Sequence, residues 1–302
     1  MKNIKLLSVF LFSILLCFSL AIVSCHKEKL GNNQNNTDTE VPSGSEDLEG
    51  ESGGGEGGEG ENPGEGEEET GDHVIPNGVT DADGNQYNTV VLGNQVWMAE
   101  NLRTTHYADG TTIPEGEYGY GHTSDTDPYW YAPADGYNVS QHGYLYNWPA
   151  VMHGAESSTA NPSGVQGLCP SGWHVPSKAE WEQLFNYVGS QSEYVCGDNP
   201  ANIAKAMCVT KDWACDEYEF ECTPGYESWS NNATGFSAYP CGWYGGAYMD
   251  PGMNVAYWST TVIDVTHLLI AAPRFICYSS TVAGLTSGSQ MAVAQPLRCV
   301  KD

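Results

Sequence analysis

Residues 26–78 form a segment that cannot build a hydrophobic core. The segment holds 15 Asp or Glu against Lys27 and Lys29, contains glycine runs such as GESGGGEGGEGENPGEGEEE, and has no Phe, Trp or Tyr. With so little apolar surface to bury, the chain cannot offset the entropy lost on ordering, and its like charges repel one another. We therefore predict an extended, solvated linker. Binding of cations or partners by its acidic clusters is the alternative interpretation.

The residues before this linker have the pattern of an export signal. Lys2 and Lys5 precede an apolar and small-residue run over residues 6–23, and the run ends in Ile-Val-Ser-Cys at residues 22–25. This tetrapeptide resembles a bacterial lipobox, in which the cysteine becomes an acylated N-terminus. We expect a lipoprotein signal peptide over residues 1–24 and attachment to a membrane through lipid on Cys25, at the outer membrane or cell surface. A retained anchor and ordinary secretion are the alternatives.

Residues 79–302 are long enough for one domain with a core of its own. This part holds 23 Asp or Glu against seven Lys or Arg, so its acidity argues against nucleic acid as a partner. All nine Trp and all 18 Tyr fall within it. Such a density of aromatic side chains suits a loop-rich exported fold or a binding surface with many stacking groups.

The cysteines of the domain agree with export. Eight remain after the signal region and Cys25 are set aside: Cys169, Cys196, Cys208, Cys215, Cys222, Cys241, Cys277 and Cys299. An even number in an oxidising compartment predicts up to four disulfides, whose pairing the spacing does not settle. A zinc site is the alternative, but the seven-residue steps between residues 208, 215 and 222 match no zinc pattern.

Two segments have clear local patterns. Two short strands are expected on either side of the turn Gly93-Asn94, with Val96 and Met98 on one face and Trp97 on the other. Ser177 and Glu180 have the spacing of a capping box, and apolar residues follow at helical intervals: Trp181, Leu184, Phe185 and Val188. A second helix is predicted over residues 200–207, with Asn199 as its cap and Pro200 at its first position.

Long irregular loops separate these elements. Residues 106–166 are mostly turn formers, with one strand-like run at residues 143–148. Asp81, Asp83 and Asn85 alternate as at the start of a calcium loop, but the downstream acidic ligand is missing, so a plain turn is favoured. Short strand-like pieces follow residue 234.

Five motifs in order resemble a known family. They are DADGNQYNTVVLGNQVWMAENLRTTHYADGTTI, CPSGWHVPSKAEWEQL, GFSAYPCGWYGG, AYWSTT and PLRCVKD, and together they span residues 79–302. In this they are similar to the Fibrobacter succinogenes major paralogous domain, which is common in lipoproteins of Bacteroidetes and Fibrobacteres. The resemblance implies an α+β, C-type-lectin-like fold, also used by formylglycine-generating enzymes, with small twisted antiparallel sheets, two helices and long loops. It implies no activity.

The resemblance also bears on the cysteines. Cys169 and Cys299 lie where the family often has cysteines, which favours a structural disulfide between them over a Cys169–His174 nucleophile and base. A loop of about 130 residues closed in this way would contribute roughly 4 to 5 kcal/mol. His174 is then expected to be a half-buried turn residue beside Trp173. An oxidase of the formylglycine-generating type would need a soft-metal cysteine pair, for which Cys241 and Cys277 are the candidates.

We expect a non-catalytic recognition or adhesion domain that binds a glycan, a surface polymer or a protein, and no required cofactor. An enzyme and a purely structural envelope component are the alternatives. Five aromatic residues are candidates for a ligand platform: Trp130, Tyr131, Trp229, Trp243 and Tyr244. Calcium is a weaker expectation, with Asp216, Glu217 and Asp250 as its candidate ligands.

Overall fold

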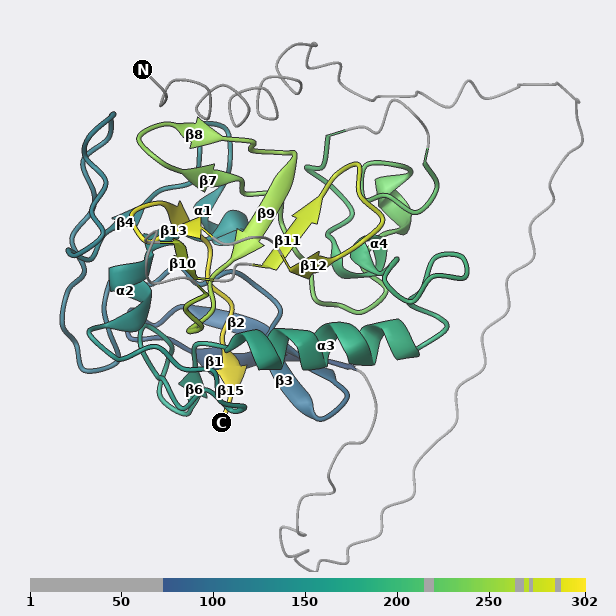
Figure 1. Cartoon of the computed structure of the whole chain (residues 1–302), viewed down its shortest axis with the longest axis horizontal. Helices are drawn as coiled ribbons and strands as arrows, with labels where there is room; N and C mark the ends of the chain where they lie inside the picture. Colours follow the sequence, from purple (N-terminus) through teal and green to yellow (C-terminus); the bar gives the residue numbers. More distant parts are fainter. Residues whose placement is uncertain (1–72, 215–219, 264–268, 272–273, 286–288) are drawn as a thin grey trace, which may run out of the picture. The chain divides into compact units, whose positions relative to one another are not determined.

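The computed structural model describes residues 73–214, 220–263, 269–271, 274–285 and 289–302 (Figure 1). Within them the fold is mixed α/β, with antiparallel sheets and few helices. The first sheet has the strand order β1-β2-β3-β15-β6 and so brings the beginning and the end of the domain together. Its strands are β1 (His73–Thr80), β2 (Gln86–Leu92), β3 (Gln95–Met98), β15 (Val300–Lys301) and β6 (Trp173–His174).

Strand β1 takes in residues that composition assigned to the linker, which was predicted to run to residue 78. It pairs with β2 from His73 onward, with a register shift between Ile75 and Val79. Pro76 lies in that shifted part, where a strand at the edge of a sheet tolerates the missing N–H. Two apolar residues before the proline and only Val79 after it were too weak a pattern to predict a strand.

The hairpin of β2 and β3 forms as predicted. Gly93 has φ +64°, as a tight hairpin turn requires, and the strands pair in register from Leu92–Gln95 to Thr89–Met98. Met98, with Val96 beside it, packs in one buried cluster, whereas Trp97 packs in another. Both faces of this sheet are therefore covered by core.

Helix α3 (Lys178–Ser190) begins where the capping box placed it. Ser177 Oγ accepts a hydrogen bond from the Glu180 N–H, and the Glu180 carboxylate accepts one from the Ser177 N–H. Trp181, Leu184 and Val188 are buried on the helix face that packs against the first sheet.

Helix α4 (Ala204–Met207) is shorter than predicted. Asn199 Oδ1 accepts a hydrogen bond from the Ala201 N–H, but residues 200–203 make turns, and Ile203 precedes the helix without a side-chain cap. The Cys196 N–H donates to the Asn202 carbonyl instead. The asparagine and proline thus mark a turn, and the helix starts one turn later.

A second five-stranded sheet has the order β4-β5-β14-β7-β8. Its strands are β4 (Trp130–Tyr131), β5 (Leu145–Asn147), β14 (Ala294–Gln295), β7 (Trp243–Tyr244) and β8 (Tyr248–Met249). Strands β9 (Asn254–Tyr257), β11 (Arg274–Cys277) and β12 (Gly284–Leu285) form a third sheet, and β10 (Leu269–Ala271) pairs with β13 (Ser289–Gln290). The short helices are α1 (Val139–His142), α2 (Trp148–Met152) and the 3₁₀ turn η2 (Ser228–Ser230).

Two disulfides pin this arrangement. Cys169 and Cys299 are bonded, with Cα atoms 5.9 Å apart, so the segment before β6 is fixed to the last strand. Cys196 and Cys222 are also bonded and close the loop that follows α3. Cys241 is a buried thiol, Cys215 lies outside the described residues, and for Cys277 only the backbone in β11 is described. In the described part of the chain no helix is both long and apolar enough to cross a membrane.

A fully buried arginine joins the sheets at the centre of the domain. Arg298 Nε donates to Asn101 Oδ1 at 2.6 Å, and its two terminal nitrogens donate to the carbonyls of Met98, Phe236 and Ser237 at 2.6 to 2.9 Å. The guanidinium also lies over the Phe236 ring, 4.8 Å from its centroid. The planar, forked guanidinium can donate to several carbonyls at once. A lysine ammonium could not satisfy all of these acceptors.

Candidate functional site

The surface formed by one loop and one hairpin concentrates tyrosines. Tyr118 and Tyr120 lie in the loop before β4, with 47% and 83% of their surface exposed, and Tyr248 on β8 is half-buried. Beneath them lie Tyr131 and Tyr244, which are buried. We call these five residues the tyrosine face.

Ring contacts hold the tyrosine face together. The centroid of Tyr118 lies 5.8 Å from that of Tyr131 and 5.7 Å from that of Tyr244, and both contacts are edge-to-face. Tyr131 and Tyr244 are 4.4 Å apart, and Tyr244 and Tyr248 are 5.2 Å apart. Aromatic pairs favour such tilted arrangements. The exposed ring of Tyr118 therefore rests on a packed aromatic layer.

Hydrogen bonds fix the loop on the hairpin. The Gly119 N–H donates to Tyr244 Oη at 2.7 Å, and the Ala132 N–H donates to Tyr118 Oη at 3.1 Å. Tyr248 Oη donates to the Ala132 carbonyl at 2.9 Å. A side chain at Gly246 would approach the backbone of Tyr120 to 3.1 Å, so a small residue allows the loop to lie this close. The loop is thus irregular in backbone but held in place.

The tyrosine face carries no positive charge of its own. No Lys or Arg occurs between Arg103 and Lys178, whereas the exposed Glu115 accepts a hydrogen bond from Tyr118 Oη at 3.1 Å. Burial raises the pKa of Tyr118, and burial together with the nearby Tyr244 raises the pKa of Tyr131 to about 12. The phenols of Tyr118 and Tyr131 therefore stay neutral at physiological pH.

The five predicted platform residues do not form one platform. Because side chains alternate along a strand, Trp130 and Trp243 point to the face of the sheet opposite Tyr131 and Tyr244. Tyr131 and Tyr244 are buried and support the tyrosine face from beneath. Trp130 Nε1 donates to the Ile113 carbonyl, and its ring packs on Tyr144. Trp229 is 73% exposed but lies on η2, within the segment that follows Cys222.

Sequence reasoning did not single out the exposed members of the tyrosine face. Tyr118 and Tyr120 stand in the run EYGYGH, where glycines alternate with tyrosines. Glycine on both sides of an aromatic ring leaves room for ring contacts and for a ligand, and this was the available signal. The sequence around Tyr248 did not predict its place in the tyrosine face, because its partner Tyr118 is far away in the sequence.

Of the calcium candidates, Asp250 has another role, and Asp216 and Glu217 lie outside the described residues. Asp216 and Glu217 fall among residues 215–219, which the structure does not describe. Asp250 accepts a hydrogen bond from Asn254 Nδ2 at 2.8 Å and has φ +55°, so it closes the turn after β8. No group of three or more metal-binding side chains occurs among the described residues.

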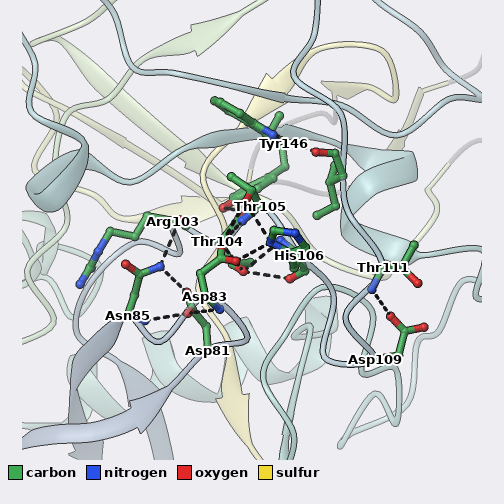
Figure 2. A network of polar contacts seen from close by, with 12 residues as sticks. Asp81, Asp83, Asn85, Arg103, Thr104, Thr105, His106, Asp109, Thr111 and Tyr146 are labelled. Atoms are coloured by element: carbon green, nitrogen blue, oxygen red, sulfur yellow. Dashed lines mark hydrogen bonds and ion pairs between the residues drawn. The ribbon is translucent and has the colours of Figure 1, made fainter.

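The alternating Asp81, Asp83 and Asn85 form a turn, as the sequence favoured (Figure 2). Asp81 Oδ1 accepts from the backbone N–H groups of Asp83 and Asn85, both at 2.9 Å. The Asp83 carboxylate binds Thr105, through its N–H and hydroxyl, and the His106 ring. Hydrogen-bond donors already occupy these oxygens, so the turn pins the segment after β3.

Cys169 and His174 do not form a nucleophile and base, because the sulfur of Cys169 is in a disulfide. His174 is buried rather than half-buried: Nε2 contacts Glu180 Oε1 at 2.5 Å and Nδ1 contacts Asp302 Oδ1 at 2.7 Å. Burial alone would lower the pKa of His174, but the hydrogen bonds that its ring donates to the carboxylates of Glu180 and Asp302 raise it above its usual value. The capping glutamate thus also fixes the imidazole.

Cys241, one of the two oxidase candidates, is a fully buried thiol. Its Sγ accepts a hydrogen bond from Asn101 Nδ2 at 3.1 Å and donates to the His142 carbonyl at 3.2 Å. Burial raises the pKa of Cys241 to about 12, despite the opposing effect of Arg298. The sulfur is therefore protonated at neutral pH, and we assign it a packing role.

A second buried histidine lies beside Cys241. His142, at the end of α1, contacts the Asn138 carbonyl through Nδ1 at 3.2 Å, and its Nε2 lies 3.6 Å from Asp212 Oδ2. The rings of Tyr137 and Tyr239 lie against the imidazole, with centroids 4.7 and 4.9 Å away. Burial lowers the pKa of His142, partly offset by Asn138 and Asp212, so the ring is neutral at pH 7.

Comparison with known proteins gives one match. The family model of the Fibrobacter succinogenes major domain matches residues 90–301, from β2 to β15. No curated protein and no solved structure matches. The matched range holds the capping box of α3, the Cys169–Cys299 disulfide and the buried Arg298. The chain belongs to the Fibrobacter succinogenes major domain family.

Proposed function

We propose that this protein is a lipid-anchored cell-envelope protein whose domain recognises a neutral glycan or glycan-like surface polymer without catalysis. The tyrosine face is the observation that carries the proposal. Tyr118 presents an exposed ring on a layer of packed tyrosines, Tyr120 presents a second exposed ring in the same loop, and hydrogen bonds hold this loop in place. Flat rings held in position can stack on sugar faces at little entropic cost.

Charge supports a neutral ligand. Acidic polymers would meet Glu115 and Glu117, and residues 104–177 contain no Lys or Arg that could offset the repulsion. The neutral phenol of Tyr118 and the carboxylate of Glu115 can instead exchange hydrogen bonds with sugar hydroxyls. A basic protein segment is the other partner that this charge would accept.

The anchor and the linker support display at the envelope. The lipobox-like residues 22–25 and the acidic residues 26–78 would tether the domain while holding it away from the membrane. Two disulfides in the described residues agree with an oxidising compartment. We also propose the C-type-lectin-like arrangement for the domain, supported by its small antiparallel sheets, few helices and long loops.

A glycan and wall-polymer array tests the proposed ligand class. The full chain is applied at low salt and again at about 0.5 M salt, where interactions between exposed charges are largely screened. We expect binding to neutral glycans that persists at high salt, is lost in Tyr118→Ala, and is retained in Tyr118→Phe, which keeps the ring. Binding to acidic polymers alone, or to none of the arrayed polymers, would overturn the proposal.

A further inference from the structure

The environment of His142 contains two hydrogen-bond acceptors that face each other. A carbonyl can only accept, so the contact with Asn138 places the proton of the neutral ring on Nδ1. Nε2 then presents a lone pair, and this buried atom has no hydrogen-bond partner among the described residues. Asp212 Oδ2 lies 3.6 Å from this nitrogen. A ring proton would not join these two atoms, because 3.6 Å is too long for a hydrogen bond, whereas a bound cation could contact both.

The separation of the two acceptors indicates which positive group fits. For a metal ion at about 2.1 Å from the histidine nitrogen and the carboxylate oxygen, the N–metal–O angle would be roughly 120°. For an ammonium nitrogen at about 2.8 Å from both atoms, the angle between them at the nitrogen would be roughly 80°. This is far from the tetrahedral angle between its N–H bonds. The 3.6 Å distance therefore suits a metal ion better than an amine.

We propose that His142 Nε2 and Asp212 Oδ2 bind a divalent transition-metal ion of the zinc class. An imidazole with one carboxylate is a donor set for Zn²⁺, Ni²⁺ or Cu²⁺ rather than for Ca²⁺, which prefers oxygen ligands. Metal-binding histidines commonly donate their other ring N–H to a backbone carbonyl, and the Asn138 carbonyl supplies that contact here.

The surroundings allow entry, and within the described residues the site has two protein ligands. The Asp212 side chain is 33% exposed, whereas that of His142 is 3% exposed, so the ion reaches the site from the Asp212 side. Water completes the coordination on that side. The rings of Tyr137 and Tyr239 wall the imidazole and hold its orientation. Exposed Lys211 is the nearby positive charge that opposes binding.

Titration of Zn²⁺ into the metal-free full chain, followed by calorimetry, tests this site. We expect one saturable site that is weakened at least tenfold in Asp212→Asn and in His142→Gln. His122→Gln is the matched control, because His122 pairs with Glu117 at 2.9 Å through an exposed ring and represents ordinary surface binding. That variant should bind Zn²⁺ as the parent does. The acidic linker is present in every variant, so its weak binding cancels.

A spectroscopic readout separates ligation from folding. In Cu²⁺ spectra of the full chain we expect nitrogen coupling from one imidazole, which His142→Gln removes and His122→Gln leaves. Asp212→Asn, at a partly exposed position, gives the answer if His142→Gln does not fold. Absence of a stoichiometric site, equal affinity in Asp212→Asn and the parent, or loss of the site in His122→Gln would each overturn the proposal.

Discussion

The region around the Cys169–Cys299 disulfide and the tyrosine face differ in how much of their side-chain surface is buried within the domain. Near the disulfide, both nitrogens of His174 meet carboxylates and the ring is buried. On the tyrosine face, Tyr118 and Tyr120 keep 47% and 83% of their surface exposed although their loop is fixed by hydrogen bonds. The first region completes its own contacts, whereas the second leaves groups available to a partner. Substitutions should therefore affect stability in the first region and binding in the second.

Removal of the long-range disulfide should have the largest effect on stability. The double variant Cys169→Ala/Cys299→Ala opens a loop whose ends are 130 residues apart, and we expect a loss of roughly 4 kcal/mol in the free energy of unfolding. Urea unfolding of the parent and the variant measures it. A loss below about 1 kcal/mol would show that the remaining contacts of β15 suffice.

Substitution of the buried Arg298 should have the second-largest effect on stability. Arg298→Met keeps the length of the side chain but leaves Asn101 Oδ1 and three carbonyls without their donor. We expect a loss of about 3 kcal/mol or more, because each buried acceptor that loses its partner is costly. Lys301→Met, on the exposed side of β15, is the control and should change stability little. Equal stability of both variants would contradict a central role for Arg298.

The buried histidine should give a smaller, pH-dependent effect. The pKa of His174 is raised in the folded protein, so the protonated ring stabilises the fold at pH values below about 6.5, the ordinary histidine pKa. This contribution is lost as the pH rises through the folded pKa. The stability advantage of the parent over His174→Gln should therefore be larger at pH 6 than at pH 9. Thermal melts at the two pH values measure it, and an advantage that grows with pH would contradict the assigned network.

Local patterns predicted the local structures of this domain. The capping box and apolar spacing after Ser177 defined α3, and the turn pair Gly93-Asn94 defined the hairpin of β2 and β3. Both depend on residues close in the sequence. The same reasoning placed a helix start at Pro200, where a turn forms, because a cap residue and a proline also begin turns.

Long-range contacts are what the sequence could not provide. Arg298 binds Asn101 across 197 residues, and Tyr118 packs on Tyr244 and Tyr248 through the pairing of distant strands. His174 was expected to be half-buried, because nothing near it in the sequence indicates that Asp302 covers it. The tyrosine face and the His142–Asp212 pair are products of topology, and no local period marks them.

The double variant Tyr118→Ala/Tyr120→Ala should have the smallest effect on stability, since Tyr120 is 83% exposed and Tyr118 47% exposed. We expect a change within about 1 kcal/mol. Trp229→Ala, which removes a 73% exposed ring on η2, is the matched control.

Binding of these variants to the glycans recognised by the parent, measured beside their melting temperatures, tests the central claim most directly. We predict that the double variant loses at least tenfold in affinity with nearly unchanged melting, while Trp229→Ala binds as the parent does. Full binding by the double variant, or an equal loss in Trp229→Ala, would contradict recognition through the tyrosine face.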